Sequence, residues 1–260
     1  MQKIIILSPH YDDAALSMAR TAAAWALAGR RIKIINIFTH SASTPFTCPM
    51  AKIRAIASQP LWFTRRAATL AVKGDLRIRD LACSALRRFE DMHAMRRYRL
   101  PIQSFDLSMK EAPIREPGQK LFRQDFAPDS LTLSQVSGAI KPHTAGGDFV
   151  VAPLGIGNHV DHLYVHLAAM LLVRPERLAF YEELPYCIEG SADCGAARAS
   201  RAMAASRAML LEESPPLPEQ VEWKLQLIAE YCSQFKAGRF LEMAGVSEKV
   251  WIPGRGCFPY

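Results

Sequence analysis

A histidine and two carboxylates stand together near the start of the chain as His10, Asp12 and Asp13. They follow the apolar run 3–7 and precede an alanine-rich segment with a helical pattern, so we expect a tight turn between a strand and a helix. Ligands of open α/β sheets bind at this edge. Adjacent carboxylates repel each other unless a cation offsets their charge. The turn therefore indicates a divalent metal site, and the alternative is an aspartate that only caps the helix.

A second cluster has the same placement and contains His159, Asp161 and His162. It follows the apolar run 148–154, which we expect to be another buried strand. The two turns converge on one site if the two strands are neighbours in a parallel sheet. A rival ligand pair exists, because His162 and His166 are four residues apart and can share one face of a helix. The spacing alone leaves both ligand sets open.

Together these turns resemble the PIG-L (LmbE-like) family of zinc-dependent de-N-acetylases. The family's Pro-His-x-Asp-Asp turn matches residues 9–13, and its His-x-Asp-His signature matches residues 159–162. Weaker similarities follow in the family's order. Residues 87–90 resemble an Arg-Arg-x-Glu helix, and residues 180–186 resemble a segment of members that work on specialised metabolites. Residue 224 with residues 231–234 resembles a late Lys…Tyr-x-Ser-Gln segment. The resemblance implies a single domain over residues 1–260. Its fold would be α/β, a Rossmann-like three-layer sandwich with a mostly parallel sheet.

The resemblance also implies a division of roles among the polar residues. His10, Asp13 and His162 would bind Zn²⁺, although Fe²⁺, Co²⁺ and Ni²⁺ also suit such ligands. Zinc lowers the pKa of a bound water to about 7, which supplies a nucleophile for amide hydrolysis. Asp12 would be the general base that takes the water proton and passes it to the leaving amine. His159, when protonated, would donate a hydrogen bond to the oxyanion.

Further positions in the resemblance concern the substrate. Asp161 could orient a histidine, and it is grouped with Tyr11, Arg87 and Arg88 as candidate substrate-binding residues, for which a simpler structural role is the alternative. Many family members have proline where this chain has Tyr11 and Val160, and glutamate is frequent where it has Ala14. Some members have tyrosine at the position of Gly157. These departures spare the expected metal ligands but leave the oxyanion partner and the substrate open.

We therefore expect a metal-dependent hydrolase that removes an N-acetyl or related N-acyl group from an amino sugar or a sugar-containing metabolite. One alternative keeps the metal chemistry but cleaves a non-sugar amide, such as a thiol conjugate or a peptide-like amide. Another is a non-catalytic α/β module that binds sugars or nucleotides, which Asp12 disfavours because a binding module needs no base. No G-x-G-x-x-G sequence follows the first apolar run, which weakens a dinucleotide-binding function.

The chain is basic, with 32 Lys and Arg against 25 Asp and Glu and a net charge of +7. Much of the excess lies between residues 65 and 99, where a basic face could attract an acidic substrate or form an ordinary solvated helix surface. No zinc finger or RNP-like sequence indicates nucleic-acid binding. The apolar segments are too short for a membrane span, the six cysteines contain no C-x-x-C pair, and no signal-peptide pattern is present. We therefore expect a cytoplasmic protein.

Apolar runs and helical patterns predict the elements that position these residues. Strands are expected at 3–7, 31–38, 102–107, 149–154 and 178–181, and helices at 14–29, 75–98, 131–140, 161–173 and 221–235. The helix at 75–98 is expected to bury a stripe made of Leu81, Leu86, Phe89, Met92 and Met95. The remaining segments are expected to be a loop at 40–60, a loop that could act as a lid at 109–126, a helix with a linker at 189–215, and a tail from residue 250.

Overall fold

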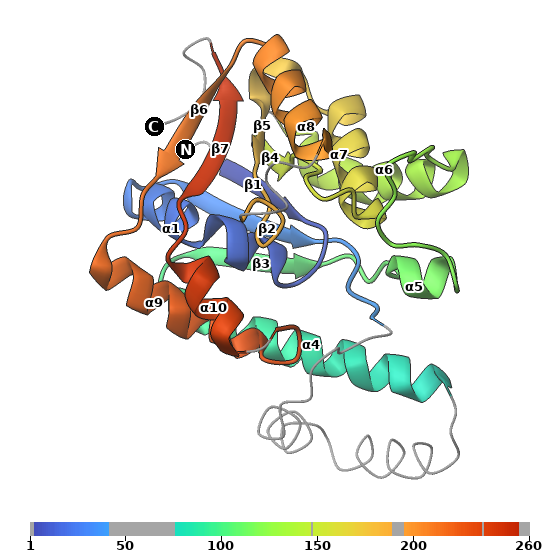
Figure 1. Ribbon diagram of the computed structural model, residues 1–260, viewed down its shortest axis with the longest axis horizontal. Helices are drawn as coiled ribbons and strands as arrows, with labels where there is room; N and C mark the ends of the chain where they lie inside the picture. Colours follow the sequence, from blue (N-terminus) through green and yellow to red (C-terminus); the bar gives the residue numbers. More distant parts are fainter. Residues whose placement is uncertain (1–2, 42–75, 147, 189–194, 236, 255–260) are drawn as a thin grey trace.

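The computed structural model of the protein describes residues 3–41, 76–146, 148–188, 195–235 and 237–254 (Figure 1). Most of the predicted loop at 40–60 lies outside these ranges. Within them, no helix combines the length and the apolar composition that a membrane span requires.

The described residues form one seven-stranded sheet with the order β3-β2-β1-β4-β5-β7-β6. Its strands are β1 (Lys3–Ser8), β2 (Arg31–Asn36), β3 (Ile102–Asp106), β4 (Phe149–Pro153), β5 (Leu178–Tyr181), β6 (Met209–Ser214) and β7 (Glu248–Pro253). The five strands from β3 to β5 are parallel, whereas β7 runs antiparallel to both β5 and β6. The expected α/β fold with a mostly parallel sheet is therefore confirmed.

Helices cover both faces of the sheet (Figure 1). One face carries α1 (Asp13–Leu27), α4 (Leu76–Tyr98), α9 (Pro218–Ile228) and α10 (Ala237–Ala244), and the other carries α6 (Ser130–Thr144), α7 (Val160–Leu172) and α8 (Gly195–Ser206). The short helix α5 (Ala112–Arg115) and the 3₁₀ turns η1 (Pro175–Arg177) and η2 (Ala229–Tyr231) complete the described elements. The result is a three-layer arrangement.

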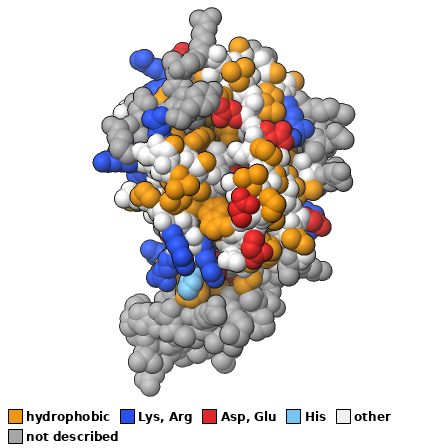
Figure 2. All heavy atoms as spheres, turned by 90° about the vertical axis from the view of Figure 1, so that its left-hand side faces the viewer, with side chains coloured by type: hydrophobic (Ala, Val, Ile, Leu, Met, Phe, Trp, Pro, Cys, Tyr) orange, Lys and Arg blue, Asp and Glu red, His pale blue; other side chains and the backbone are white. Residues whose placement is uncertain are grey.

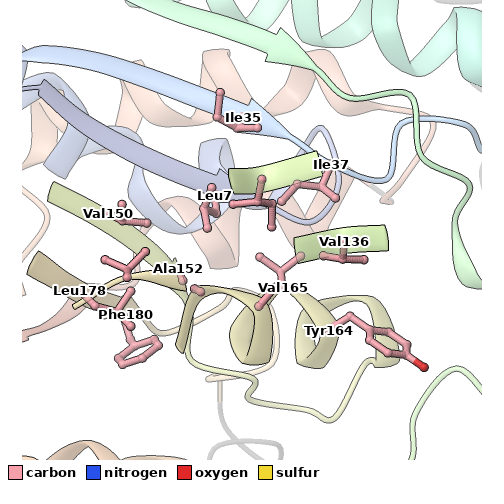
Figure 3. Close-up of a cluster of buried hydrophobic side chains, with 14 of the residues drawn as sticks. Leu7, Ile35, Ile37, Val136, Val150, Ala152, Tyr164, Val165, Leu178 and Phe180 are labelled. Atoms are coloured by element: carbon pink, nitrogen blue, oxygen red, sulfur yellow. The ribbon is translucent and has the colours of Figure 1, made fainter. Parts of the chain in front are cut away.

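The first strand is buried on both faces and joins the two helical layers. Ile4 and Ile6 belong to a buried cluster with residues of α1, whereas Ile5 and Leu7 belong to a cluster with residues of α6 and α7. Figure 3 shows Leu7 among side chains from the neighbouring strands and from these helices. All four side chains are at most 1% exposed, and burying a side chain of this size contributes about 1.5–3 kcal/mol. This continuous apolar run explains why β1 sits at the centre of the sheet.

The strand order changes direction beside β1. The chain proceeds from β1 to β2 and β3 on one side, and then returns to place β4 and β5 on the other. Ile4 is paired with Phe149 and Ile6 with Val151, so β1 and β4 end side by side. Such a switch point opens a crevice at the carboxyl ends of the strands, where ligands bind. The two polar turns that follow β1 and β4 therefore meet.

Several predicted elements need correction. The linker expected within 189–215 contains β6, and residues 250–253 of the expected tail belong to β7. The helix expected at 221–235 is α9 followed by the turn η2. Leu81 and Met92 of α4 are 50% and 46% exposed, so the predicted buried stripe was wrong at these two positions. Both side chains line a surface cavity instead of the core.

Candidate metal centre

The turn after β1 does not use its aspartates to cap α1. Asp12 occupies the N-cap position, but its side chain makes no capping hydrogen bond. The backbone N–H of Ala14 donates instead to Ser8 Oγ at 3.0 Å. Asp13 Oδ2 accepts from the backbone N–H of His10 at 2.8 Å, which closes the turn. The alternative in which Asp12 serves only as a helix cap is therefore wrong, and its carboxylate is left for another contact.

Three of the predicted ligands come together around one oxygen. Asp13 Oδ2 lies 3.1 Å from His10 Nδ1 and 3.3 Å from His162 Nε2. One ligand atom from each of these residues lies within 4.8 Å of the others, a spacing that could hold a metal ion. His10, His159 and Asp161 form a second group with the same property. The structure thus offers two overlapping ligand sets.

The outer contacts of the histidines favour the first set. His10 Nε2 lies 3.1 Å from Asp161 Oδ2, and His162 Nδ1 lies 3.3 Å from Glu183 Oε1. A metal-binding histidine commonly donates its second ring N–H to a carboxylate, which fixes the tautomer and the ring orientation. His162 Nε2 is buried and has no hydrogen-bond partner among the described residues. A divalent ion would supply that missing partner, so the residues fit a metal.

Two buried carboxylates hold these histidines and are themselves held firmly. Glu183 accepts hydrogen bonds from the backbone N–H groups of Gly155 at 2.8 Å and Ile156 at 3.3 Å. Asp161 accepts from the backbone N–H of Ala112 at 3.1 Å and pairs with Arg115 Nη1 at 2.8 Å. Both carboxylates are fully buried. The expectation that Asp161 could orient a histidine agrees with this geometry.

Asp12 lies beside the ligands and outside both ligand sets. Its Oδ1 lies 3.1 Å from Arg87 Nη2. Arg87 Nη1 pairs with Glu111 and donates to Ser41 Oγ at 2.5 Å. The side chain of Arg87 is only 6% exposed. Arg87 therefore sits between Asp12 and Glu111 and positions the Asp12 carboxylate.

The segment between residues 109 and 126, considered above as a lid, is attached to the centre. Its Glu111 contacts Arg87 and its Arg115 contacts Asp161. Farther along, the backbone N–H of Val160 donates to Leu121 at 2.9 Å, and that of Arg123 donates to Asn158 at 3.0 Å. One short stretch of chain thus supports both the Asp12 side and the His10 side of the site.

His159 is placed as a neutral hydrogen-bond donor. Its Nδ1 accepts from the backbone N–H of Asp161 at 3.3 Å, so the ring proton belongs on Nε2. The ring centroid lies 5.0 Å from that of His10 and 5.2 Å from that of His162. Burial, followed by the charges of these two histidines, lowers the pKa of His159 to about 3.

The local charges create a need for a cation. Burial would lower the pKa of His162, but Asp13 and Glu183 raise it to about 9. Burial would raise the pKa of Asp13, but His162 and His10 hold it well below its usual value. Burial raises the pKa of Asp12, and Arg87 opposes this rise. The histidines and carboxylates of the centre are therefore electrostatically coupled, and the negative charge of the carboxylates favours a cation.

Aromatic side chains form a rim beside the histidines. The ring of Phe122, a residue that is 52% exposed, lies 5.2 Å from that of His159 and 5.9 Å from that of Tyr186. The Tyr186 ring lies 5.5 Å from that of His162. Gly157 has a φ of +86°, and a Cβ there would approach the Tyr186 ring to 2.7 Å. Tyr186 therefore fills the space that a side chain at residue 157 would need.

The other predicted residues have different surroundings. His166 Nδ1 lies 2.9 Å from the carbonyl oxygen of Pro153, and His166 belongs to neither ligand set. The Tyr11 hydroxyl donates to Asp106 at 3.0 Å, and Arg88 Nε lies 3.4 Å from the same carboxylate. Tyr11 is 4% exposed, whereas the side chain of Arg88 is 68% exposed. Of the two, Arg88 is the one that solvent reaches.

Glu111, Arg115 and Glu183 were missed from the sequence. Glu183 had a detectable signal, because it stands two residues after the fully buried strand β5, at the same sheet edge as the two turns. Glu111 and Arg115 lie in a charged, proline-containing segment that gives no periodic pattern. Their contacts depend on how that segment folds back over the site.

The comparisons with known proteins can be placed beside this geometry. No family model matches the chain. The chain is 28% identical over 237 residues to the 2'-N-acetylparomamine deacetylase of Streptomyces fradiae. The alignment covers 89% of this chain and 73% of that protein. That relative is a deacetylase.

Two solved structures share the fold. The zinc-inhibited form of teicoplanin deacetylase superposes with a TM-score of 0.63 at 21% identity, over 96% of this chain and 97% of that one. The N,N'-diacetylchitobiose deacetylase of Pyrococcus horikoshii gives a TM-score of 0.52 at 16% identity, over 97% and 84% of the two chains. The similarity therefore extends over nearly the whole length of this chain.

Proposed function

We propose that this protein is a metal-dependent hydrolase that removes an N-acetyl or related N-acyl group from an amino sugar or a sugar-containing metabolite. Zn²⁺ is the ion we propose, with His10, Asp13 and His162 as its ligands. The observation that carries the proposal is that each histidine faces Asp13 with one ring nitrogen and a buried carboxylate with the other. The similarity to an N-acetylparomamine deacetylase supports the choice of reaction and substrate class.

The chain's own residues divide the chemistry among them. When bound, the ion supplies Lewis acidity, which activates water near neutral pH and polarises a carbonyl group. Asp12 stands next to a ligand without being one, so its carboxylate takes the proton of the attacking water and later delivers it to the leaving amine. Arg87 holds Asp12 through Oδ1. This contact fixes the carboxylate while proton transfer takes place.

His159 supplies the hydrogen bond to the developing oxyanion. Because its Nδ1 accepts a backbone hydrogen bond, Nε2–H is available to the substrate without an added proton. This changes the role expected from the sequence, in which His159 donated when protonated. Phe122 and Tyr186 border the same position and give it an apolar side, which suits an acyl methyl group or the face of a sugar ring.

The experiment combines metal analysis with acetate release from a panel of N-acetylated amino sugars. Four proteins are compared: wild type, Asp12→Ala, His162→Ala and, as a matched histidine control, His166→Ala. We expect one metal ion per wild-type chain, loss of the ion in His162→Ala, and retention of the ion with loss of turnover in Asp12→Ala. His166→Ala should retain its ion, because that residue belongs to neither ligand set.

The contrary results are distinct from one another. A wild-type chain that binds no divalent ion would overturn the metal site and with it the proposed mechanism. Metal binding without acetate release from any sugar would retain the site and reject the substrate class. Loss of metal from His166→Ala but not from His162→Ala would establish a different ligand set.

A further inference from the structure

A cavity lies along the carboxyl edge of the sheet, beside the turn that follows β1. It has a volume of about 880 Å³ and is bounded by α4 and by residues at the carboxyl ends of β2 and β3. Volumes of about 300–1,000 Å³ are usual for small-molecule sites. Tyr11, which stands between His10 and Asp12 in the catalytic turn, also lines this cavity. The cavity therefore adjoins the candidate site.

Among the residues that the structure describes, two arginines and one carboxylate line the cavity. Arg88 and Arg96 project from α4 two helical turns apart, and His40 and His93 add two imidazoles. The carboxylate that lines the cavity among the described residues is Asp106. On the face shown in Figure 2, Lys and Arg side chains gather beside a histidine at the lower edge of the described surface.

Asp106 is already engaged and leaves the arginines exposed. Its Oδ2 accepts from Tyr11 at 3.0 Å, and its Oδ1 accepts from Asn36 at 3.3 Å. Arg88 reaches Asp106 only at 3.4 Å and keeps 68% of its side chain exposed. Arg96 is exposed and forms no ion pair with any residue that the structure describes. The guanidinium groups therefore have donors to offer to a ligand.

The cavity also presents apolar surface. Leu81 and Met92 on α4 are 50% and 46% exposed, and Phe105 on β3 is 41% exposed. The sequence pattern placed the first two in the core, so their exposure is a departure from an ordinary buried helix stripe. Exposed apolar side chains rimmed by charges are typical of binding sites.

We propose that this cavity is a subsite for an acidic group carried on an apolar body, such as an aromatic or acyl substituent bearing a carboxylate or phosphate. The inference rests on the proposed hydrolase function, and it assigns the part of the substrate remote from the amide. Arg88 and Arg96 bind the acid, while Leu81, Met92 and Phe105 contact the apolar part. The basic stretch noted in the sequence thereby gains a role.

The charge distribution explains why an acid is placed here and not beside the metal ligands. Buried carboxylates surround the centre: Asp12, Asp13, Glu111, Asp161 and Glu183. An acidic substituent near them would be repelled wherever the ion did not contact it directly. The cavity carries the opposite sign of charge, so it orients an acidic substrate with its amide toward the metal.

Direct binding tests the subsite without requiring turnover. Phenyl phosphate, benzoate and neutral benzyl alcohol are titrated calorimetrically into the zinc-loaded protein. We expect both acids to bind more tightly than benzyl alcohol, and the Arg88→Ala/Arg96→Ala protein to lose about tenfold in affinity for the acids. The control is Arg97→Ala, which removes one positive charge from α4, half of the change in the double variant, at a residue paired with Glu230 and outside the cavity.

The outcomes separate the subsite from the rest of the site. If the acids bind the double variant as tightly as the wild type, they contact the metal or another surface, and the proposal is wrong. Equal losses in Arg97→Ala and in the double variant would reduce the effect to general electrostatic attraction and would overturn it as well. If benzyl alcohol and benzoate bind with equal affinity, the cavity does not recognise an acid, and the proposal is wrong.

Kinetics then connect the subsite to the reaction. The 4-carboxybenzyl and benzyl glycosides of N-acetylglucosamine differ only in the acid. We expect the wild type to favour the first through a lower KM, and the double variant to lose this preference. If neither glycoside is hydrolysed, the failure concerns the proposed function, and the titrations above still decide whether the cavity binds acids.

Discussion

Two buried clusters of charge in this protein are built on different principles. One surrounds Glu248 at the start of β7, where the strand packs against α1 and α9. Glu248 Oε1 accepts from Lys224 Nζ at 2.8 Å and from the backbone N–H of Arg20 at 3.1 Å. Its Oε2 accepts from the backbone and the hydroxyl of Thr21, at 2.9 and 2.8 Å. The guanidinium of Arg20 donates to carbonyl oxygens, including that of Ala244 at 2.9 Å.

This first cluster satisfies its carboxylate from within the chain. Burial lowers the pKa of Lys224, and Glu248 opposes that shift. Burial alone would raise the pKa of Glu248, but Lys224 and Arg20 keep it below its usual value. Arg20 Nε is the atom of the cluster that finds no partner among the described residues. The cluster joins α1, α9 and β7 and needs no ligand.

The metal-centre cluster has the opposite balance. Five carboxylates face two guanidinium groups there: Asp12, Asp13, Glu111, Asp161 and Glu183 against Arg87 and Arg115. His162 Nε2 is buried without a hydrogen-bond partner among the described residues. A buried carboxylate paired with cations of the same chain holds elements together, whereas a buried cluster with more carboxylates than guanidinium groups favours a cation. This difference is the reason that we propose a structural role for the first cluster and a metal-binding role for the second.

Breaking the Glu248 cluster should produce the largest loss of stability. Glu248→Gln leaves Lys224 buried without its counter-charge, so we expect the free energy of unfolding to fall by about 3–5 kcal/mol in urea titrations. Metal content should stay unchanged. The control, Glu242→Gln, removes an exposed pair with Arg239 and should cost less than about 1 kcal/mol. Comparable losses in both variants would refute the structural role assigned to Glu248.

Adding metal should stabilise the folded protein only when the proposed metal ligands are intact. A ligand that binds the folded state alone stabilises it by about 2.7 kcal/mol at 100 times its Kd and by about 4.1 kcal/mol at 1,000 times its Kd. We therefore expect Zn²⁺ to raise the melting temperature of the wild type and of Glu248→Gln by calorimetry. His162→Ala should show no such rise. A rise of the same size in His162→Ala would place the ion elsewhere.

The residues that hold the proposed metal ligands in place allow a more specific test of the comparison. Arg115→Ala removes the cation beside Asp161, the carboxylate that orients His10, so metal affinity should fall by about 10–100-fold. Titration with Co²⁺ and its visible absorption spectrum would measure both the affinity and the ligand geometry. Arg123→Ala is the matched control, because it removes a cation paired with Glu116 in the same segment. An unchanged cobalt spectrum and affinity in Arg115→Ala would exclude this support.

The sequence predicted the parts of the fold that are locally uniform. β1 and β4 are continuous apolar runs, and each is buried along nearly its whole length. β6 and β7 were not predicted. They form an antiparallel pair at one end of the sheet, where the burial of their side chains is not continuous and depends on partners that are distant in the chain. The helix α10 was missed for a similar reason, since its short apolar face gains meaning only against α9.

The site shows the same division. His10 and Asp13 share one turn, and a parallel sheet with β4 beside β1 is enough to bring the turn of His162 to them. Glu183, by contrast, reaches His162 across a tertiary contact, and Glu111 reaches Arg87 from a segment without periodic pattern. Adjacent ligand residues leave a signature in the sequence. Their supporting residues are joined only by the fold, and single-sequence reasoning does not pair them.

Acid should remove the contribution of Glu248 gradually, by at most about 1.4 kcal/mol for each pH unit. Because the pKa of Glu248 is lowered on folding, its contribution is complete above its unfolded pKa, near 4.5, and is lost as the pH falls through the lower folded value. Glu248→Gln mimics the protonated side chain. The unfolding free energies of the wild type and of this variant should therefore stay apart from pH 7 down to about pH 4.5 and converge below it. If the two curves stay parallel to about pH 3, the charge of the Glu248 carboxylate does not contribute to stability through Lys224.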